Sequence, residues 1–300
     1  MTPIQIPLAS ILRDHAAWLE KPDSGHQADL SGMTLNDSTF ERAVLRQAIL
    51  SRATLLDANL SGADLSGAQM ESADLQRANL ANADLSNATL NAAVFSGAWL
   101  HGTNLSEINA AGTLFKQTRL NEARMLEATV KDASFHQASA VRASFHHSRF
   151  YDVDFTEADL EYAVFYHARL QHSRFFGVNA TAASFGGAKV DHCDFTHAVL
   201  RGGTFARSEL IQCLFRHANL RQCDFTDARL LGGDFGLAVL EGARFGGAVL
   251  KMADFRGANL AGARELTSDQ LTGSITDGTT VLPNGKRGPY VRNSGAERVK

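Results

Sequence analysis

Hydrophobic residues recur along most of the chain with a period of five. From Leu30 to Leu260, 40 of the 47 residues spaced five apart are Leu or Phe, and the residue two positions earlier is usually Ala. A period of five would scatter Leu around an α-helix and would place it on alternating faces of a straight strand. The pattern therefore predicts a chain that turns after every five residues and closes into coils, with Leu, Phe and Ala inside.

Phenylalanine indicates how many five-residue units close one coil. Two series of Phe recur every 20 residues, and they are offset from each other by ten. The series that we predict to form the structural core is Phe95, Phe115, Phe135, Phe155, Phe175, Phe195, Phe215, Phe235 and Phe255. A period of 20 means four units per coil, with the two series on opposite sides. We therefore predict an all-β solenoid of about twelve four-sided coils.

The repeated motif resembles a known family. Runs such as Ala58-Asn59-Leu60 and Ala63-Asp64-Leu65 are similar to the tandem Ala-(Asp/Asn)-Leu units of pentapeptide-repeat proteins. The resemblance covers roughly residues 28–264, and it implies a right-handed quadrilateral parallel β-helix. In such a solenoid each coil is stabilised mainly by its two neighbours.

Both ends of the repeat region carry different patterns. Apolar residues at helical spacing, from Leu8 to Leu19, predict a helix near residues 7–20. Thr267 and Gln270 have the spacing of a capping box and predict a second short helix, with an extended segment to follow over 279–282. We predict four parts: an N-terminal capping helix and linker (1–27), the β-helix (28–264), a C-terminal cap (265–284) and a flexible basic tail (285–300).

Composition narrows the class of protein. The formal net charge is −3, which argues against a strongly basic nucleic-acid binder, so we expect no direct nucleic-acid contact. No stretch of the sequence has the length and hydrophobicity of a membrane span or a signal peptide, which favours a cytoplasmic protein with no membrane partner. The three cysteines occupy the small inward site of the repeat and suggest neither a disulfide framework nor a zinc site.

The sequence contains no recognisable catalytic or phosphate-binding motif. HExxH, GxSxG, GxGxxG and GxxxxGK are all absent from it, so we predict no enzyme, no catalytic residue, no cofactor and no metal site. The Asp or Asn before each central Leu is best explained as a turn-forming side chain. Three pairs of outward His residues are spaced 20 apart: His147 and His167, His172 and His192, and His197 and His217. They could bind a metal or sense pH, although simple stacking of like residues is the plainer interpretation.

The segment 146–176 is the strongest surface candidate, because outward aromatic residues lie there among carboxylates. Such mixtures are typical of partner-binding surfaces, although outward aromatics also shield stacked turns. The predicted interaction patch consists of Tyr151, Asp152, Asp154, Glu157, Asp159, Glu161, Tyr162, Tyr166, His167 and Phe176.

These observations predict a non-enzymatic interaction module, a rigid solenoid rod that presents outward side chains to a protein partner. The family resemblance implies an alternative, since some members mimic B-form DNA, bind DNA gyrase or topoisomerase IV, and protect against quinolones or other poisons. Acids exceed bases by nine to four over residues 29–112, whereas bases exceed acids by twelve to eight over 166–264, so only the early half suits mimicry. A secreted effector or adaptor is a second alternative. Apolar residues near the C-terminus, such as Leu266 and Leu271, could support a homodimer or could merely cap the last coil.

Overall fold

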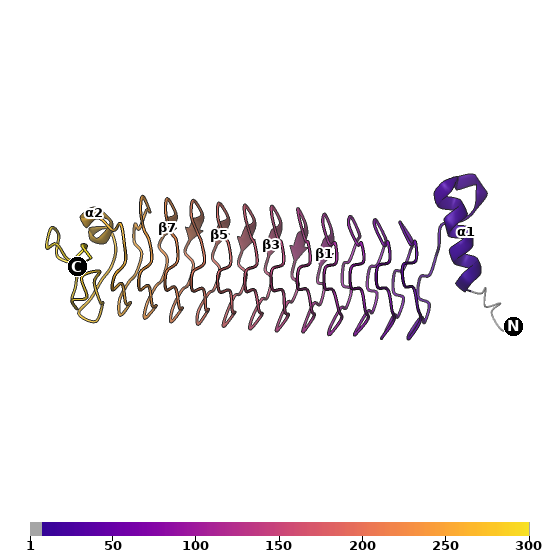
Figure 1. Ribbon diagram of the computed structural model, residues 1–300, viewed down its shortest axis with the longest axis horizontal. Helices are drawn as coiled ribbons and strands as arrows, with labels where there is room; N and C mark the ends of the chain where they lie inside the picture. The colour runs from indigo at the N-terminus through magenta and orange to yellow at the C-terminus, as the bar shows by residue number, and fades with distance from the viewer. Residues whose placement is uncertain (1–7, 300) are drawn as a thin grey trace. The chain divides into compact units, whose positions relative to one another are not determined.

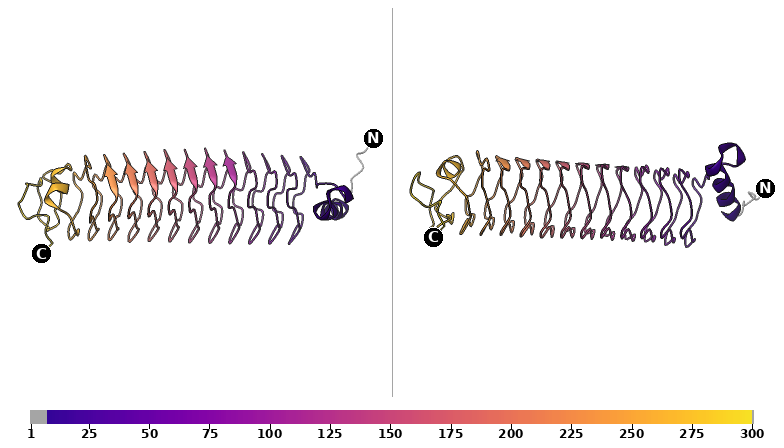
Figure 2. Two further views of the ribbon diagram at one scale, coloured as in Figure 1. Left: turned by 90° about the horizontal axis from the view of Figure 1, so that it is seen from above. Right: turned by 45° about the horizontal axis from the view of Figure 1, so that its top comes forward.

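The computed structural model describes residues 8–299. The chain divides into two compact units, Met1–Ser134 (unit 1) and Phe135–Lys300 (unit 2). In each unit the backbone winds into a series of stacked coils, which Figures 1 and 2 show from three directions. The five-residue register of the sequence continues across the division between residues 134 and 135 without an insertion.

Regular elements are short and mostly confined to one side of the coil. Unit 1 contains α1 (Leu8–Glu20), the 3₁₀ helix η1 (Pro22–Ser24), β1 (Asn109–Ala111) and β2 (Thr129–Lys131). Unit 2 contains β3 (Arg149–Tyr151), β4 (Arg169–Gln171), β5 (Lys189–Asp191), β6 (Glu209–Ile211), β7 (Arg229–Leu231) and α2 (Ser268–Thr272). Within each unit, neighbouring strands pair in parallel between residues 20 apart, such as Arg149 with Arg169. Isolated parallel bridges join the other sides at the same spacing, so the predicted β-solenoid with 20-residue coils is confirmed.

Each coil has four sides, which we name from the coil over residues 153–172. Side A is centred on Phe155, side B on Leu160, side C on Phe165 and side D on Leu170. Adding or subtracting 20 gives the equivalent residue in another coil. The strands β1 to β7 all lie on side D.

Backbone hydrogen bonds define both the stacking of coils and their corners. The Leu65 amide donates to the Asp84 carbonyl (2.7 Å), and the Asp84 amide donates to the Ala63 carbonyl (2.9 Å), which makes a parallel ladder. At the corner before it, the Ala63 amide donates to the Leu60 carbonyl (3.0 Å) and closes a turn. The second residue inside that turn, Gly62, has a φ of 64°. Since Gly adopts this left-handed conformation without strain, its frequency two residues after the central Leu follows from the corner.

The interior contains the hydrophobic positions of the repeat. All nine phenylalanines of the predicted core series are buried. On side A, Phe155 and Phe175 stack with ring centroids 4.7 Å apart and an interplanar angle of 14°. Phe165 on side C meets the Phe155 ring edge-on, at 6.1 Å and 88°. The two Phe series thus face each other across the core, as the offset of ten residues predicts.

Helix α1 closes the first coil of unit 1, as expected. Its range agrees with the helix predicted for 7–20, except that residue 7 lies outside the described residues. His15 is the buried anchor of the helix: its Nδ1 accepts a hydrogen bond from the Ala28 amide (3.0 Å), and its ring stacks on Trp18 at 5.6 Å. This bond satisfies an amide at the start of the first coil, which would otherwise be left without a partner.

Helix α2 and the segment after it cover the last coils of unit 2. The predicted capping box between Thr267 and Gln270 is present. The Gln270 side-chain amide also donates to the carbonyls of Phe245 and Ala248, at 2.8 Å each, and so satisfies acceptors on the coil beneath. The extended segment predicted for 279–282 is confirmed only in part: Val281 forms a parallel bridge with Asn259, whereas Thr279 lies in a turn that the Thr280 amide closes by donating to the Asp277 carbonyl (3.2 Å).

The C-terminal segment, for which the sequence predicts a flexible tail over 285–300, contacts helix α2. Within residues 285–299, the Tyr290 amide donates to Thr276 Oγ1 (2.8 Å), and the Tyr290 hydroxyl lies 2.8 Å from Ser268 Oγ. Arg292 forms an ion pair with Asp269 at 2.9 Å. These contacts join the segment to α2 and to Thr276, and the flexibility predicted for residues 285–300 stays a prediction.

Candidate interaction surface

Three residues of each five-residue unit point outward: the one before the central residue and the two after it. The first of these is often Asp or Asn, and its side chain turns back onto the backbone. Asp64 Oδ1 accepts from the Ser66 amide (3.2 Å), and Asp194 Oδ1 accepts from the Thr196 amide (2.9 Å). The predicted turn-forming role is confirmed, and these carboxylates serve the fold.

The ten residues of the predicted patch encircle unit 2 and do not share one surface. Side D carries Tyr151 and Asp152, side A carries Asp154, Glu157 and Phe176, side B carries Asp159, Glu161 and Tyr162, and side C carries Tyr166 and His167. A partner that lies against one side can contact only a subset of them.

Several members of the patch on sides A and B are engaged with neighbouring coils. Glu157 accepts a hydrogen bond from the Gln137 side chain (2.8 Å), and Asp159 accepts one from the Asn179 side chain (3.0 Å). The Arg142 guanidinium lies 5.3 Å from the Tyr162 ring centroid. These contacts join neighbouring coils, as expected if the outward side chains stabilise the stacked turns.

Side C presents an aromatic corner. The Tyr166 and His167 rings lie 4.1 Å apart, and Tyr166 is 44% exposed. His147 stacks on His167 at 5.4 Å, and His146 lies 6.0 Å from Tyr166. Burial lowers the pKa of His146, and the nearby His147 and His167 lower it further. His146 is therefore held toward its neutral form at the edge of this corner.

A groove begins beside this corner because the next coil has glycines in the corresponding positions. Gly186 and Gly187 follow Tyr166 and His167 by 20 residues, and the hollow measures about 840 Å³. A Cβ atom at Gly186 would lie 3.3 Å from Tyr166 Cδ2, and one at Gly187 would overlap the His167 ring. The two glycines thus leave room for the two rings, which lean over the groove.

Charged and hydroxyl side chains complete the groove. Its lining includes the cations Lys189, Arg207 and Arg244, the hydroxyls of Ser184, Thr204 and Thr226, and the carboxylates Asp224 and Asp227. Arg244 is paired with Glu265 at 2.8 Å, whereas Arg207 has no ion pair within residues 8–299. The groove therefore combines an exposed aromatic ring with side chains of both charges, and Arg207 is the cation of this lining that has no ion pair in the described part of the chain.

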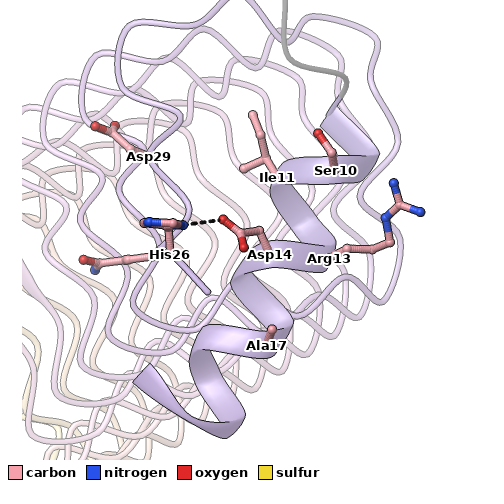
Figure 3. Close-up of a pocket in the computed structure, with 8 residues that line it drawn as sticks. Ser10, Ile11, Arg13, Asp14, Ala17, His26 and Asp29 are labelled. Carbon is pink, nitrogen blue, oxygen red and sulfur yellow. Dashed lines mark hydrogen bonds and ion pairs between the residues drawn. The ribbon is translucent and has the colours of Figure 1, made fainter. Parts of the chain in front are cut away.

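A second hollow lies at the start of unit 1, between α1 and the first coil (Figure 3). It measures about 700 Å³ and is lined by residues such as Ile11 and Asp29. Across it, His26 Nδ1 donates to the Asp14 carboxylate at 2.8 Å. This contact ties the helix to the segment that enters the first coil, so the hollow is explained by the cap.

Comparison with known families agrees with this architecture. Models described as "Pentapeptide repeats" match residues 28–67, 38–77, 68–106, 100–137, 141–177 and 181–216, and a second model of the same description matches 215–259. These matches cover more than half of the chain. The chain belongs to the pentapeptide-repeat family.

Solved pentapeptide-repeat structures are similar to this chain. HetL, involved in heterocyst differentiation regulation in the cyanobacterium Nostoc sp. strain PCC 7120, is 24% identical; the match covers 94% of this chain and 99% of HetL, with a TM-score of 0.31. A trypsin-treated form of the plasmid-mediated fluoroquinolone resistance protein QnrB1 is 20% identical over 57% of this chain and 88% of its own, with a TM-score of 0.31. A protein from the Arabidopsis thaliana thylakoid lumen is 27% identical over 40% and 68%, with a TM-score of 0.21. No curated protein matches this chain.

The pentapeptide repeat also explains the cysteines. Cys193, Cys213 and Cys223 are buried at the small inward site. Burial raises the pKa of Cys213 and of Cys223 to about 12, and the Cys223 thiol donates to the Leu200 carbonyl at 3.0 Å. A thiol with so high a pKa is a poor nucleophile, so these residues act as core side chains.

The outward His residues that the sequence pairs at a spacing of 20 lie on adjacent coils of unit 2. Two of the three predicted His pairs are stacked, His147 with His167 at 5.4 Å and His197 with His217 at 4.8 Å, and the His172 and His192 rings are tilted by 32° at 5.3 Å. No group of three or more His, Cys, Asp or Glu side chains in the part of the chain that the structure describes could hold a metal ion. None of the helices formed by residues 8–299 has the length and hydrophobicity needed to cross a membrane.

Sequence reasoning singled out Tyr166 and His167 but missed the groove beside them. Lys189, Arg207, Gly186 and Gly187 were not among the predicted site residues. The signal was available in the period of 20, since two glycines directly follow the Tyr-His pair in the next pentapeptide-repeat coil. The apolar C-terminal residues Leu266, Leu271 and Leu282 are buried, and the homodimer stays a prediction.

Proposed function

We propose that this protein is a non-enzymatic protein-interaction module, and that the groove on side C of unit 2 is its binding surface. The observation that carries the proposal is the combination found there: Tyr166 exposed over the groove, Lys189 and Arg207 beside it, and hydroxyl groups along its floor. Tyr and Arg are the residue types most enriched at protein interfaces.

The backbone holds this surface in place before any partner arrives. The His167 amide donates to the Gly186 carbonyl and the Gly187 amide donates to the Ala206 carbonyl, at 3.1 and 2.9 Å. Each outward side chain therefore projects from a hydrogen-bonded corner. A preorganised surface loses little conformational entropy on binding, which favours affinity.

Binding is also a better explanation than catalysis for the polar groups of side C. Ser144 Oγ lies 2.6 Å from His146 Nδ1, which is the nearest approach to a nucleophile–base pair among the described residues of this side. Ser144 and His146 stand two residues apart in one repeat unit, where Asp and Asn make the same local turn contact elsewhere. Their proximity thus follows from the repeat.

Capture of partners by the immobilised full-length chain tests this proposal. We expect Tyr166→Ser to lose partners that the wild type retains, because Tyr166 borders the groove. Tyr162→Ser is the matched control, since Tyr162 is 47% exposed but lies on side B. Identical capture by all three proteins would contradict a binding role for side C.

The alternative of a DNA mimic that binds gyrase or topoisomerase IV has one supporting observation. In unit 1, Asp64 and Asp84 are paired in register on adjacent coils of side C, as stacked phosphate substitutes would be. However, Arg46 lies 3.4 Å from Asp64, and Asp57 is neutralised by Arg77. A supercoiling assay with gyrase and a quinolone tests this function, and unchanged inhibition in the presence of the protein would remove it.

A further inference from the structure

A row of basic side chains crosses side D of unit 2. Arg149, Arg169 and Lys189 occupy the same position on β3, β4 and β5, where the parallel register sets each opposite the next. All three are exposed. The strands stack side by side in Figure 1, and a strand spacing of about 4.8 Å brings the three positive charges close together.

This arrangement is unfavourable for the isolated protein. Like charges directly opposite on neighbouring strands destabilise a sheet. Arg149 and Arg169 form no ion pair within residues 8–299, whereas Lys189 Nζ is paired with the Glu209 carboxylate on β6 at 3.9 Å. Other arginines of unit 2 are paired with carboxylates: Arg216 with Asp234, Arg221 with Glu241, and Arg256 with Asp254. The charges of Arg149 and Arg169 are therefore left uncompensated by the fold, and Glu209 on β6 ends the row.

The row continues into the groove of side C. Lys189 lines that groove, together with Arg207 one coil further on. We call Arg149, Arg169, Lys189 and Arg207 the basic strip. It crosses about 15 Å of stacked coils, which is the length of about five residues of extended chain.

We propose that the basic strip and the groove bind an extended, carboxylate-rich segment of a partner protein. This inference rests on the proposed function and names the chemistry of its partner. The acidic side chains of the segment would pair with the strip, and its polar groups would hydrogen bond with Ser184 and Thr204 in the groove.

The surroundings of the strip favour a peptide over a nucleic acid. Asp224 and Asp227 line the far part of the groove and would repel any anion there, so a bound chain must offer uncharged donor groups at that point, which a phosphate backbone with a charge on every unit does not. They are suitable acceptors for the amide groups of a peptide, which alternate with its acidic side chains.

Fluorescence anisotropy with the full-length chain tests the proposal. The probe is a labelled eight-residue peptide of alternating Glu and Gly, and its Gln-for-Glu counterpart is the neutral control. We expect the double variant Arg149→Gln/Arg169→Gln to weaken binding of the Glu peptide about tenfold. The matched variant Arg174→Gln/Arg201→Gln removes two exposed charges from sides A and B, and we expect a change below about twofold.

Any other outcome of this experiment contradicts the inference. Equal weakening by the two double variants would mean that total charge alone matters, and no binding of the Glu peptide by the wild type would remove the site. Tighter binding of an eight-nucleotide single-stranded DNA, lost in Arg149→Gln/Arg169→Gln, would assign the strip to nucleic acid. Circular dichroism checks that both variants fold. If partner capture depends on Tyr166 but the Glu peptide does not bind, this inference is wrong and the proposed function stands. If neither Tyr166-dependent capture nor peptide binding is observed, both the inference and the proposed function are wrong.

Discussion

The cores of the two units fill coils of the same backbone geometry with different side chains. The coils over residues 45–90 of unit 1 have Leu at every central position except Met70, whereas unit 2 has two facing series of Phe. Yet the ladder bonds are equally long: 2.7 Å from the Leu65 amide to the Asp84 carbonyl, and 2.7 Å from the Phe165 amide to the Ser184 carbonyl.

This equality shows that the backbone sets the separation of the coils and that the core adapts to it. Rings on the same side of unit 2 stack at distances such as 4.9 Å between Phe165 and Phe185, close to the spacing of neighbouring strands. Leu meets the same requirement without a ring, because it has more than one rotamer. Aromatic edge-to-face contacts are then an additional stabilisation that unit 2 has and the Leu coils lack.

The surfaces of the two units share one kind of outward residue, and unit 2 adds another. In both units outward Asp and Asn bond to their own turns, as Asp64 does to the Ser66 amide and Asp194 to the Thr196 amide. In unit 2, Arg149 and Arg169 face each other on adjacent strands with no carboxylate between them. Outward residues that stabilise the fold through hydrogen bonds can thus be distinguished from outward residues whose charges are not compensated.

The largest expected effect tests the difference between the cores. Phe195 stacks on Phe175 and Phe215 at 4.7 and 5.0 Å, so we expect Phe195→Ala to lower the free energy of unfolding by about 3–5 kcal/mol. Leu65→Ala in unit 1 should cost about 1 kcal/mol less, because no ring contact is lost. Urea denaturation followed by circular dichroism measures both. Phe176→Ala is the control, because Phe176 is 38% exposed, and an equal loss there would contradict the account of the core.

A smaller effect separates the two kinds of surface residue. Asp64→Ala removes the acceptor for the Ser66 amide and hydroxyl, and we expect it to lower the free energy of unfolding by about 1–2 kcal/mol. Asp64→Asn keeps the acceptor and should restore most of this loss. Arg149→Gln should be neutral or slightly stabilising, since it relieves repulsion. Thermal denaturation ranks the three variants, and a destabilised Arg149→Gln would show that the strip has a structural role.

The smallest effect concerns the cap of unit 1 and depends on pH. Burial lowers the pKa of His15 below its ordinary value of 6.5. The unfolded segment therefore takes up a proton at a higher pH than the folded one. Stability is full above about pH 6.5, falls as the pH drops toward the folded pKa, and then levels off.

Hydrogen exchange of the α1 amides, expressed as protection factors, measures this local stability. We expect protection of α1 to decrease between about pH 7.5 and 5.5 in the wild type. His15→Gln has no titrating ring, and it should be less protected overall but should lose less between these values. A parallel decrease in both proteins would assign the pH dependence to other groups.

Much of the fold could be predicted because the repeat is local and redundant. The core phenylalanines, the four-sided coil, the helix around His15 and the capping box at Thr267 all follow from spacing alone. The C-terminal segment could not be predicted, since Tyr290 and Arg292 bind groups on α2 that no periodic pattern connects to them. The site was only partly foreseen, as Tyr166 stood out by composition whereas Lys189 and Arg207 did not.

The sequence by itself determined which residues lie inside, which lie outside and how many units close a coil, because a period repeated many times specifies one register. Only the tertiary structure decided which outward residues meet. Tyr151 and Tyr162 are close to Tyr166 in sequence but lie on other sides, whereas Gly186 and Lys189, a full coil further along, share its surface. The physical reason is that stacking joins residues 20 apart, while each corner turns consecutive units away from one another.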